Sequence, residues 1–240
     1  MKPIALAVAA TLTITTGVFA EAQKKDVDIK APDGIGLKGT YFSAGGRSPA
    51  LLLLHQCNMD RHAWDGLAND LASAGINVLT IDFRGFGESG GDKLPFGEIA
   101  RTVIPQKFPG DVEAAYAFLL AQKDVDASRV AAGGASCGVT QSSDLAARHP
   151  EIKTLMVLSG VASQEANAHI SKTPALAVFG AASEDDKAAA AGIKAELAAS
   201  TNPKSVLRMY GGAEHGVPMF AKNPALEPMI VSWLKTQLGR

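Results

Sequence analysis

A short glycine-flanked stretch around Ser136 has the residue types of a nucleophilic site. Residues 134–138 read GASCG, which fits the pattern G-x-S-x-G. The apolar residues 130–133 precede it and residues 139–149 have the composition of a helix, so the pattern predicts a strand, a tight turn and a helix. Such a turn gives the serine a positive φ and requires glycine on both sides, because a Cβ would collide across the turn. Ser136 is therefore a candidate nucleophile; the alternative is a Gly/Ser-rich turn without chemistry.

A serine nucleophile needs a general base, and His215 is the candidate. It lies in residues 211–216 (GGAEHG), directly after the last predicted strand, where flanking glycines let the imidazole reach over the sheet edge. The other four histidines fall on predicted helices, in a polar connection or at the end of an early strand: His62, His149, His169 and His55. We expect structural roles for these four.

The carboxylate that orients the base is expected just after the predicted strand 175–179. Residues 183–186 (SEDD) offer three carboxylates there. Spacing from the strand end favours Asp185, with Glu184 as the second choice. The alternative is that all three only begin the next helix, where acidic side chains interact favourably with the helix dipole.

These candidates follow strands of a predicted α/β sheet. Residues 27–31 and 37–42 alternate in polarity around a Pro-Asp-Gly turn and predict an opening hairpin. Further strands are predicted at 50–54, 77–81, 130–133, 155–158, 175–179 and 205–210, and helices at 61–74, 110–122, 139–149, 185–199 and 224–238. Apolar runs without alternation suit strands that are buried on both faces. The alternation of strands and helices predicts a mainly parallel central sheet with an antiparallel start and helices on both faces.

The order serine, acid, histidine on such a sheet resembles the α/β-hydrolase family from about residue 37 to the C-terminus. Residues 52–56 (LLLHQ) look like the strand and His-Gly turn that begin the family's oxyanion loop, with Gln56 in place of the glycine. Residues 82–89 (DFRGFGES) resemble the family's D-x-R-G-x-G-x-S turn. The short chain and the Ser-Cys-Gly of the turn look most like the dienelactone-hydrolase-like branch, whose members use cysteine where this chain has Ser136.

The resemblance also implies an oxyanion hole made of two backbone N–H groups. One belongs to Cys137, directly after the nucleophile, and the other to a residue just after His55, either Cys57 or Gln56. Two such preorganised donors each contribute about 3 to 4 kcal/mol to transition-state stabilisation.

Cys57 and Cys137 are the only two cysteines of the chain. If both donors converge on one oxygen, their Cα atoms come near the roughly 4.4 to 6.8 Å that a disulfide requires. The resemblance thus leads to the hypothesis of a disulfide that ties the oxyanion loop to the serine turn in an oxidising compartment. Two buried free thiols, or Cys137 as the nucleophile, are the rival hypotheses.

Composition excludes several other classes of function. The 240 residues are 47% hydrophobic and 20% charged, as in one globular domain, and the formal charge of −1 gives no basic field for nucleic acid. Residues 85–90 (GFGESG) match the dinucleotide pattern, but residues 91–95 cannot open the helix that would hold a pyrophosphate. No pair of histidines or cysteines has a chelating spacing, so neither a metal nor a cofactor is predicted.

The N-terminus predicts export. An apolar stretch, residues 4–19, follows Met1-Lys2-Pro3, and the residues before Ala20 suit a signal peptidase. We expect a signal peptide over residues 1–20 and one α/β-hydrolase domain over residues 21–240, with cleavage after Ala22 as the alternative. A transmembrane anchor is the competing interpretation, but four threonines interrupt a stretch that is short for a span of roughly 20 apolar residues. The mature protein is expected to be periplasmic or secreted, without a stable membrane anchor.

The connection 159–173 is too short for a large cap domain, so the only candidate cover over the site is the stretch 90–109. Its apolar side chains either line an acyl pocket or pack down as loop anchors.

Together these features predict an exported serine hydrolase that cleaves a small carboxylic ester or related acyl bond through Ser136, His215 and Asp185. An exopeptidase or amidase would use the same triad but needs a charged anchor for a peptide terminus, and the sequence identifies none. A non-catalytic binding protein on this fold is the other alternative, although such proteins normally lack a triad member. The expected partner is a small-molecule ester.

Overall fold

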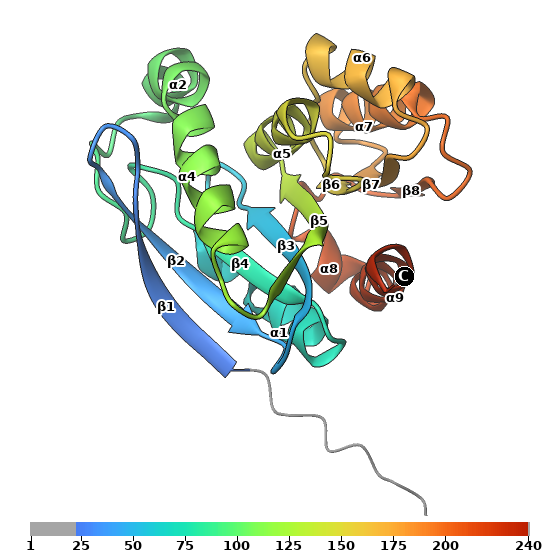
Figure 1. Ribbon diagram of the computed structural model, residues 1–240. Coiled ribbons are helices and arrows are strands. Elements are labelled where there is room, and N and C mark those ends of the chain that lie inside the picture. The colour runs from blue at the N-terminus through green and yellow to red at the C-terminus, as the bar shows by residue number, and fades with distance from the viewer. Residues whose placement is uncertain (1–22, 240) are drawn as a thin grey trace, which may run out of the picture.

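The computed structural model describes residues 23–239, and residues 1–22 and 240 lie outside the described part (Figure 1). The predicted signal peptide and its cleavage positions therefore fall outside the description. No helix within residues 23–239 is long and apolar enough to cross a membrane.

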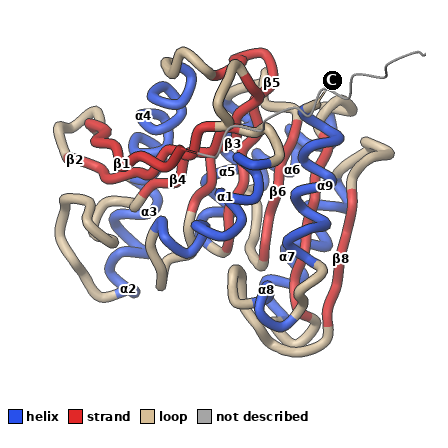
Figure 2. The backbone as a smooth tube through the Cα atoms, turned by 90° about the horizontal axis from the view of Figure 1, so that it is seen from below, coloured by secondary structure: helices blue, strands red, loops and turns tan. Residues whose placement is uncertain are grey.

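The strands form an eight-stranded sheet in the order β1-β2-β4-β3-β5-β6-β7-β8, with β1 and β2 near one end and β8 at the other (Figure 2). β1 pairs antiparallel with β2, and β2 with β4, whereas the remaining pairs are parallel. The strands are β1 (Gln23–Lys30), β2 (Gly36–Ser43), β3 (Ser48–Leu54), β4 (Asn77–Ile81), β5 (Val125–Ala135), β6 (Thr154–Leu158), β7 (Ala177–Ser183) and β8 (Val206–Tyr210). The predicted mainly parallel sheet with an antiparallel start is confirmed.

Helices cover both faces of this sheet (Figure 1). They are η1 (Arg61–Trp64), α1 (Asp65–Ser73), α2 (Phe96–Glu98), η2 (Ile99–Val103), α3 (Ile104–Gln106), α4 (Phe108–Leu120), α5 (Cys137–Arg148), α6 (Gln164–Lys172), α7 (Lys187–Ala199), α8 (Met219–Lys222) and α9 (Leu226–Leu238). Buried residues of α4, α5, α6 and α7 join one hydrophobic cluster, and those of η1, α1, α8 and α9 join a second. The sheet therefore separates two cores.

The central strand β3 shows why its sequence has no polar alternation. Leu52 and Leu54 belong to the first hydrophobic cluster, whereas Leu51 and Leu53 belong to the second. Successive side chains of a strand point to opposite faces, and here both faces are covered by helices. A continuous run of leucine is the result.

The parallel strands place the candidate residues at one edge of the sheet. β3, β5, β6, β7 and β8 run in the same direction, so their carboxyl ends lie together. In open α/β sheets ligands bind outside these carboxyl ends. The loops that follow β3, β5, β7 and β8 therefore meet at one site.

Two segments differ from the prediction. β7 continues to Ser183, four residues beyond the predicted strand end, and the expected polar connection after β6 contains α6. Ser163 caps this helix by accepting a hydrogen bond from the backbone N–H of Ala166 at 3.0 Å. α6 packs beside α5 and α7, in agreement with the absence of a large cap domain.

The candidate cover, residues 90–109, divides into packed and exposed parts. Ile99 and Phe108 are buried, and the Phe108 ring stacks on Phe83 with their centroids 4.0 Å apart. Phe96, in contrast, is 61% exposed. Most of the segment is thus anchored to the core, and Phe96 alone of these three rings and chains faces solvent.

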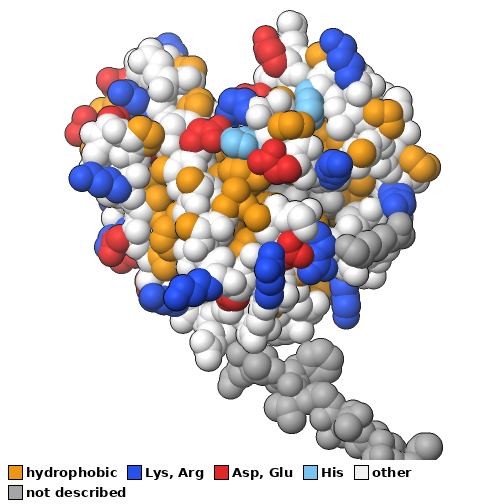
Figure 3. Space-filling model, in the orientation of Figure 1, with side chains coloured by type: hydrophobic (Ala, Val, Ile, Leu, Met, Phe, Trp, Pro, Cys, Tyr) orange, Lys and Arg blue, Asp and Glu red, His pale blue; other side chains and the backbone are white. Residues whose placement is uncertain are grey.

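The outer surface combines apolar and charged regions. In the orientation of Figure 1, hydrophobic side chains are visible in a band down the middle of the face, and charged side chains lie around it (Figure 3).

Candidate active site

Ser136 occupies a strained turn between β5 and α5. β5 ends at Ala135, α5 begins at Cys137, and Ser136 between them has φ 54° and ψ −118°. The predicted strand, turn and helix with a positive φ are confirmed. The N-terminus of α5 follows directly, so its positive dipole end lies beside the serine.

The two glycines of the pattern are needed for different contacts. A Cβ on Gly134 would overlap the backbone of Gly138, which is the predicted collision across the turn. A Cβ on Gly138 would instead overlap the carbonyl oxygen of Leu54, at the end of β3. The second glycine therefore allows the serine turn to approach the loop that follows β3.

His215 contacts Asp186 and not Asp185. The distance from His215 Nδ1 to Asp186 Oδ2 is 2.6 Å. Because a carboxylate can only accept, Nδ1–H donates this bond, which leaves Nε2 without a proton in the neutral ring. The expectation that Asp185 partners the histidine is wrong in geometry: its side chain is 64% exposed and pairs with Lys187 at 3.2 Å.

The length of β7 explains this correction. The strand was expected to end at residue 179 but continues to Ser183, so the turn begins later and Asp186 becomes the residue before α7. Glu184, the second choice, pairs with Lys194 at 2.9 Å. Of the three carboxylates, only Asp186 reaches the histidine loop.

Ser136 and His215 line two adjacent cavities. One, of about 240 Å³, is also lined by Cys57, Asn58 and Phe96. The other, of about 270 Å³, is lined by residues of α5, the loop after β6 and the start of α7, including Val161. The serine and the histidine thus stand at the boundary between two spaces that could each hold part of a substrate.

The loop after β3, residues 55–59, is held by the buried imidazole of His55. Its Nδ1–H donates to the carbonyl oxygen of Gln56 at 2.8 Å, and its Nε2 accepts from the backbone N–H of Phe83 at 3.1 Å. These bonds fix the neutral tautomer, and burial lowers the pKa of His55. His55 is structural, as expected.

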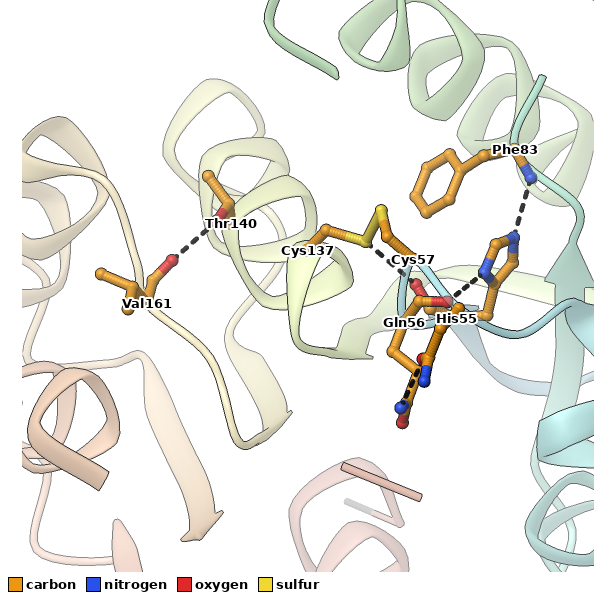
Figure 4. Close-up of a disulfide and its surroundings, with 8 residues drawn as sticks. His55, Gln56, Cys57, Phe83, Cys137, Thr140 and Val161 are labelled. Atoms are coloured by element: carbon orange, nitrogen blue, oxygen red, sulfur yellow. Dashed lines mark hydrogen bonds between the residues drawn. A yellow bond between two sulfur atoms is a disulfide. The ribbon is translucent and has the colours of Figure 1, made fainter. Parts of the chain in front are cut away.

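A disulfide joins Cys57 to Cys137, with their Cα atoms 5.9 Å apart (Figure 4). It connects the loop after β3 to the first residue of α5, as hypothesised. The backbone N–H groups of Gln56, Cys57 and Cys137 donate to no acceptor in the part of the chain that the structure describes. They are therefore available to a substrate oxygen, and both predicted alternatives for the second donor stay open.

The turn at residues 82–89 buttresses this loop from below. The buried carboxylate of Asp82 accepts from the backbone N–H of Arg61 at 2.7 Å and from the backbone N–H of Glu88 at 2.9 Å. The Arg61 guanidinium binds Asp82 at 2.5 Å. The D-x-R-G-x-G-x-S stretch therefore forms a structural turn and no helix follows it within residues 89–95.

Sequence reasoning missed three features of the site: Asp186, the contacts of the Gln56 side chain, and Val161 beside the second cavity. A stretch of two adjacent aspartates was the available signal for the first. Among residues 23–239, no group of three or more His, Cys, Asp or Glu side chains could hold a metal ion.

A comparison with protein families matches residues 49–215 to the model described as alpha/beta hydrolase fold. Two proteins are similar over about half of the chain. The uncharacterized protein Rv2307c of Mycobacterium tuberculosis is 34% identical over 128 residues, which are 52% of this chain and 42% of that protein. Thiohydrolase apmlB of Arthrinium phaeospermum is 29% identical over 133 residues, 55% of this chain and 41% of that protein. The chain thus spans less than half the length of either relative.

Solved structures share the fold along nearly the whole chain. The esterase Pf2001 of Pyrococcus furiosus has a TM-score of 0.66 at 16% identity and covers 96% of this chain and 98% of its own. A dienelactone hydrolase from Anabaena variabilis has a TM-score of 0.69 at 19% identity and covers 91% of this chain and 100% of its own. With the family model matching well over half of its residues, the chain belongs to the α/β-hydrolase fold family.

Proposed function

We propose that this protein is an exported serine hydrolase that cleaves small carboxylic esters through Ser136, His215 and Asp186. The observation that carries the proposal is the 2.6 Å contact between Asp186 and His215, on a histidine that lines the same two cavities as Ser136. The hydrolase names of the structural relatives agree with it.

In the proposed reaction, His215 Nε2 takes the proton of the Ser136 hydroxyl as its oxygen attacks the substrate carbonyl carbon. Asp186 orients the imidazole and stabilises the imidazolium that forms. The C–O bond to the leaving alcohol then breaks, and the imidazolium returns its proton to that oxygen. Water repeats the cycle on the acyl-enzyme and releases the carboxylic acid.

The developing oxyanion is assigned to two backbone donors, Cys137 N–H and Cys57 N–H, with Gln56 N–H as the alternative to Cys57. The disulfide supports the pairing with Cys57, because it holds the two donor residues 5.9 Å apart at their Cα atoms. Fixed donors of this kind need no reorganisation when the charge forms.

The cavity linings favour a substrate with uncharged groups on both sides of the scissile bond. Among the residues that line the two cavities, only His215 and Asp186 are ionisable, and these two pair with each other. Exposed apolar side chains stand at each cavity, Phe96 at one and Val161, 52% exposed, at the other. A charged peptide terminus would find no counter-ion there, which disfavours the exopeptidase alternative.

Steady-state hydrolysis of p-nitrophenyl acetate, butyrate and hexanoate by the wild type and by Ser136→Ala tests the proposal. A thioester of the same acyl group belongs in the panel because one relative is named a thiohydrolase. We expect Ser136→Ala to lose about 10⁴-fold or more in kcat. Equal rates for the folded variant and the wild type would contradict the proposed nucleophile.

Export is the second part of the proposal. The apolar segment 4–19 supports it, and a disulfide is typical of an oxidising compartment. Expression of the full chain in a bacterium, followed by osmotic release and intact-mass analysis, should give a periplasmic product that begins at Glu21. A full-length product retained in the cytoplasm would contradict export without touching the catalytic proposal.

A further inference from the structure

The side chain of Gln56 links two loops of the site. It is 1% exposed and both ends of its amide are bonded. Oε1 accepts from the backbone N–H of Val217 at 2.9 Å, and Nε2 donates to Asn58 Oδ1 at 2.8 Å. Val217 lies two residues after His215, so Gln56 connects the oxyanion loop, residues 55–59, to the histidine loop, residues 211–217.

The same loop is also tied to the serine turn. Gln56 precedes Cys57, whose disulfide leads to Cys137 (Figure 4). The oxyanion loop therefore has one covalent tie to the segment that carries the nucleophile and one hydrogen-bonded tie to the segment that carries the base. Through these ties the three segments are held in one arrangement.

The histidine loop needs such a tie because its backbone contains two glycines with positive φ. Gly212 has φ 102° and Gly216 has φ 70°. Glycine loses more conformational freedom on ordering than any other residue, so this loop has many alternative conformations unless contacts restrict them. The bond from Val217 N–H to Gln56 is the contact that lies nearest in sequence after His215.

Gly216 and Gln56 fit each other. A Cβ on Gly216 would overlap Oε1 of Gln56, so the glycine lets the amide oxygen approach the backbone of the histidine loop. The position of Gln56 resembles one where the family usually has glycine, and a glycine there has no side chain with which to make this link. The link is thus a feature of this chain's own residues.

We propose that Gln56 is a positioning residue that fixes the His215 imidazole relative to Ser136 by holding the backbone at Val217. The inference rests on the proposed function, in which His215 is the base. Displacement of a catalytic group by about 1 Å can cost about 10²-fold in rate, which is the scale of effect to expect.

The test compares Gln56→Met with the matched control Gln141→Met. Met has nearly the same size and shape as Gln but cannot accept a hydrogen bond from Val217. Gln141 is also buried, lies on α5 and lines neither cavity, and its Oε1 has no partner among the described residues. For both variants we measure the rate constant of labelling by a fluorophosphonate, kcat and KM for p-nitrophenyl butyrate, and Tm.

We expect labelling and kcat of Gln56→Met to fall about 10- to 100-fold while KM changes little, because proton transfer and not binding is impaired. Gln141→Met should retain both rates. Gln56→Asn keeps a buried amide but is one methylene short of Val217, so it should lose rate in the same way and serves if the Met variant does not fold.

A double-mutant cycle supplies a second measurement. Gly216→Ala should cost less labelling rate in a Gln56→Ala background than in the wild type, by about 3-fold or more, because the added methyl group then has room. Additive effects would contradict the fit between the two residues.

The outcomes separate the two proposals. If the wild type labels at Ser136 and Gln56→Met labels equally fast, the inference about Gln56 is wrong and the proposed function stands. If the folded wild type does not label, the proposed function fails, and the inference fails with it.

Discussion

Buried charges are arranged differently on the two sides of the site. The oxyanion side, formed by β1–β4 and the helices before β5, carries two buried arginines that are each paired with a buried carboxylate. Arg61 binds Asp82, and Arg84 binds Asp111 at 2.6 Å. Each of these charges has a partner of opposite sign, which offsets the cost of burial.

The acid–histidine side, formed by β6–β8 and α6–α9, contains a buried carboxyl group without such a partner. Glu196 of α7 is fully buried, and one of its oxygens accepts from the Ser143 hydroxyl at 2.7 Å. Its Oε2 has no hydrogen-bond partner among the described residues. Burial raises the pKa of Glu196 to about 7.

This difference indicates that the two sides have separate tasks. The paired side holds the oxyanion loop in one place, with its charges compensated. The other side carries the ionisable pair that the reaction requires, His215 and Asp186, and a carboxyl group that titrates near neutral pH. We expect changes in pH or in single charges to act mainly through the acid–histidine side.

The largest effect is expected from Asp186→Asn, with Asp185→Asn as its matched control. An asparagine amide at residue 186 would favour the wrong tautomer of His215, so kcat should fall about 10³- to 10⁴-fold. The neighbouring Asp185 is exposed and contacts only Lys187, so its variant should stay within about 2-fold of the wild type. Kinetics with p-nitrophenyl butyrate measure both, and the reverse ranking would restore the sequence-based choice of Asp185.

Removal of the disulfide tests the rigidity of the oxyanion side. The bridge closes a loop with a sequence separation of 80. The double variant Cys57→Ser/Cys137→Ser should lose about 4 kcal/mol of unfolding free energy because its unfolded chain is less restricted. Urea denaturation of the variant and of the reduced wild type should give the same value. Equal stability of oxidised wild type and variant would show that the bridge does not contribute.

A pH series separates the two sides. Folded Glu196 holds its proton more tightly than an unfolded glutamate, whose pKa is 4.5. Its contribution to stability is therefore complete below pH 4.5 and is lost as the pH rises through about 7, a loss of up to about 3 kcal/mol.

The variant Glu196→Gln should remove this loss, so that denaturant titrations show a flatter dependence on pH between 5 and 8, about the range set by the two pKa values. On the oxyanion side the sign is opposite. Burial lowers the pKa of His55, so its contribution is present above pH 6.5, the ordinary value, and is lost as the pH falls. An unchanged slope in Glu196→Gln would contradict the assignment to Glu196.

The smallest effect concerns Phe96, which is exposed although it belongs to the otherwise anchored oxyanion side. Phe96→Ala should reduce the preference for hexanoate over acetate by several-fold, about 1 kcal/mol, since apolar contact with the longer chain is lost. Leu207→Ala, an exposed apolar residue on β8 that lines neither cavity, is the control. The ratio of kcat/KM values measures this, and a chain-length preference equal to that of wild type would exclude Phe96 from the acyl site.

Regular parts of the fold could be predicted because apolar runs and turn residues mark them. β4 was predicted with the observed bounds, and the Ser136 turn follows from its glycines. The end of β7 could not be predicted because residues 180–183 (GAAS) are small and resemble a loop. The structure explains this composition: a Cβ on Gly180 would overlap Leu197 and Ile193, so small residues let α7 pack closely on β7.

The candidate site was predictable to the same extent. Ser136 and His215 follow from motif and position, but the choice among residues 184–186 required the strand end. The link from Gln56 to Val217 joins residues 161 positions apart, and no local pattern indicates such a contact. Long-range hydrogen bonds of this kind depend on the folded arrangement of loops.

The most direct test of the central claim is the site and rate of fluorophosphonate labelling, measured by intact mass and peptide mapping on the mature, folded protein. We predict one adduct, on Ser136, that is absent in Ser136→Ala, strongly slowed in Asp186→Asn and unaffected in Asp185→Asn. No adduct on the folded wild type, or an adduct at another residue, would contradict the claim that His215 and Asp186 activate Ser136.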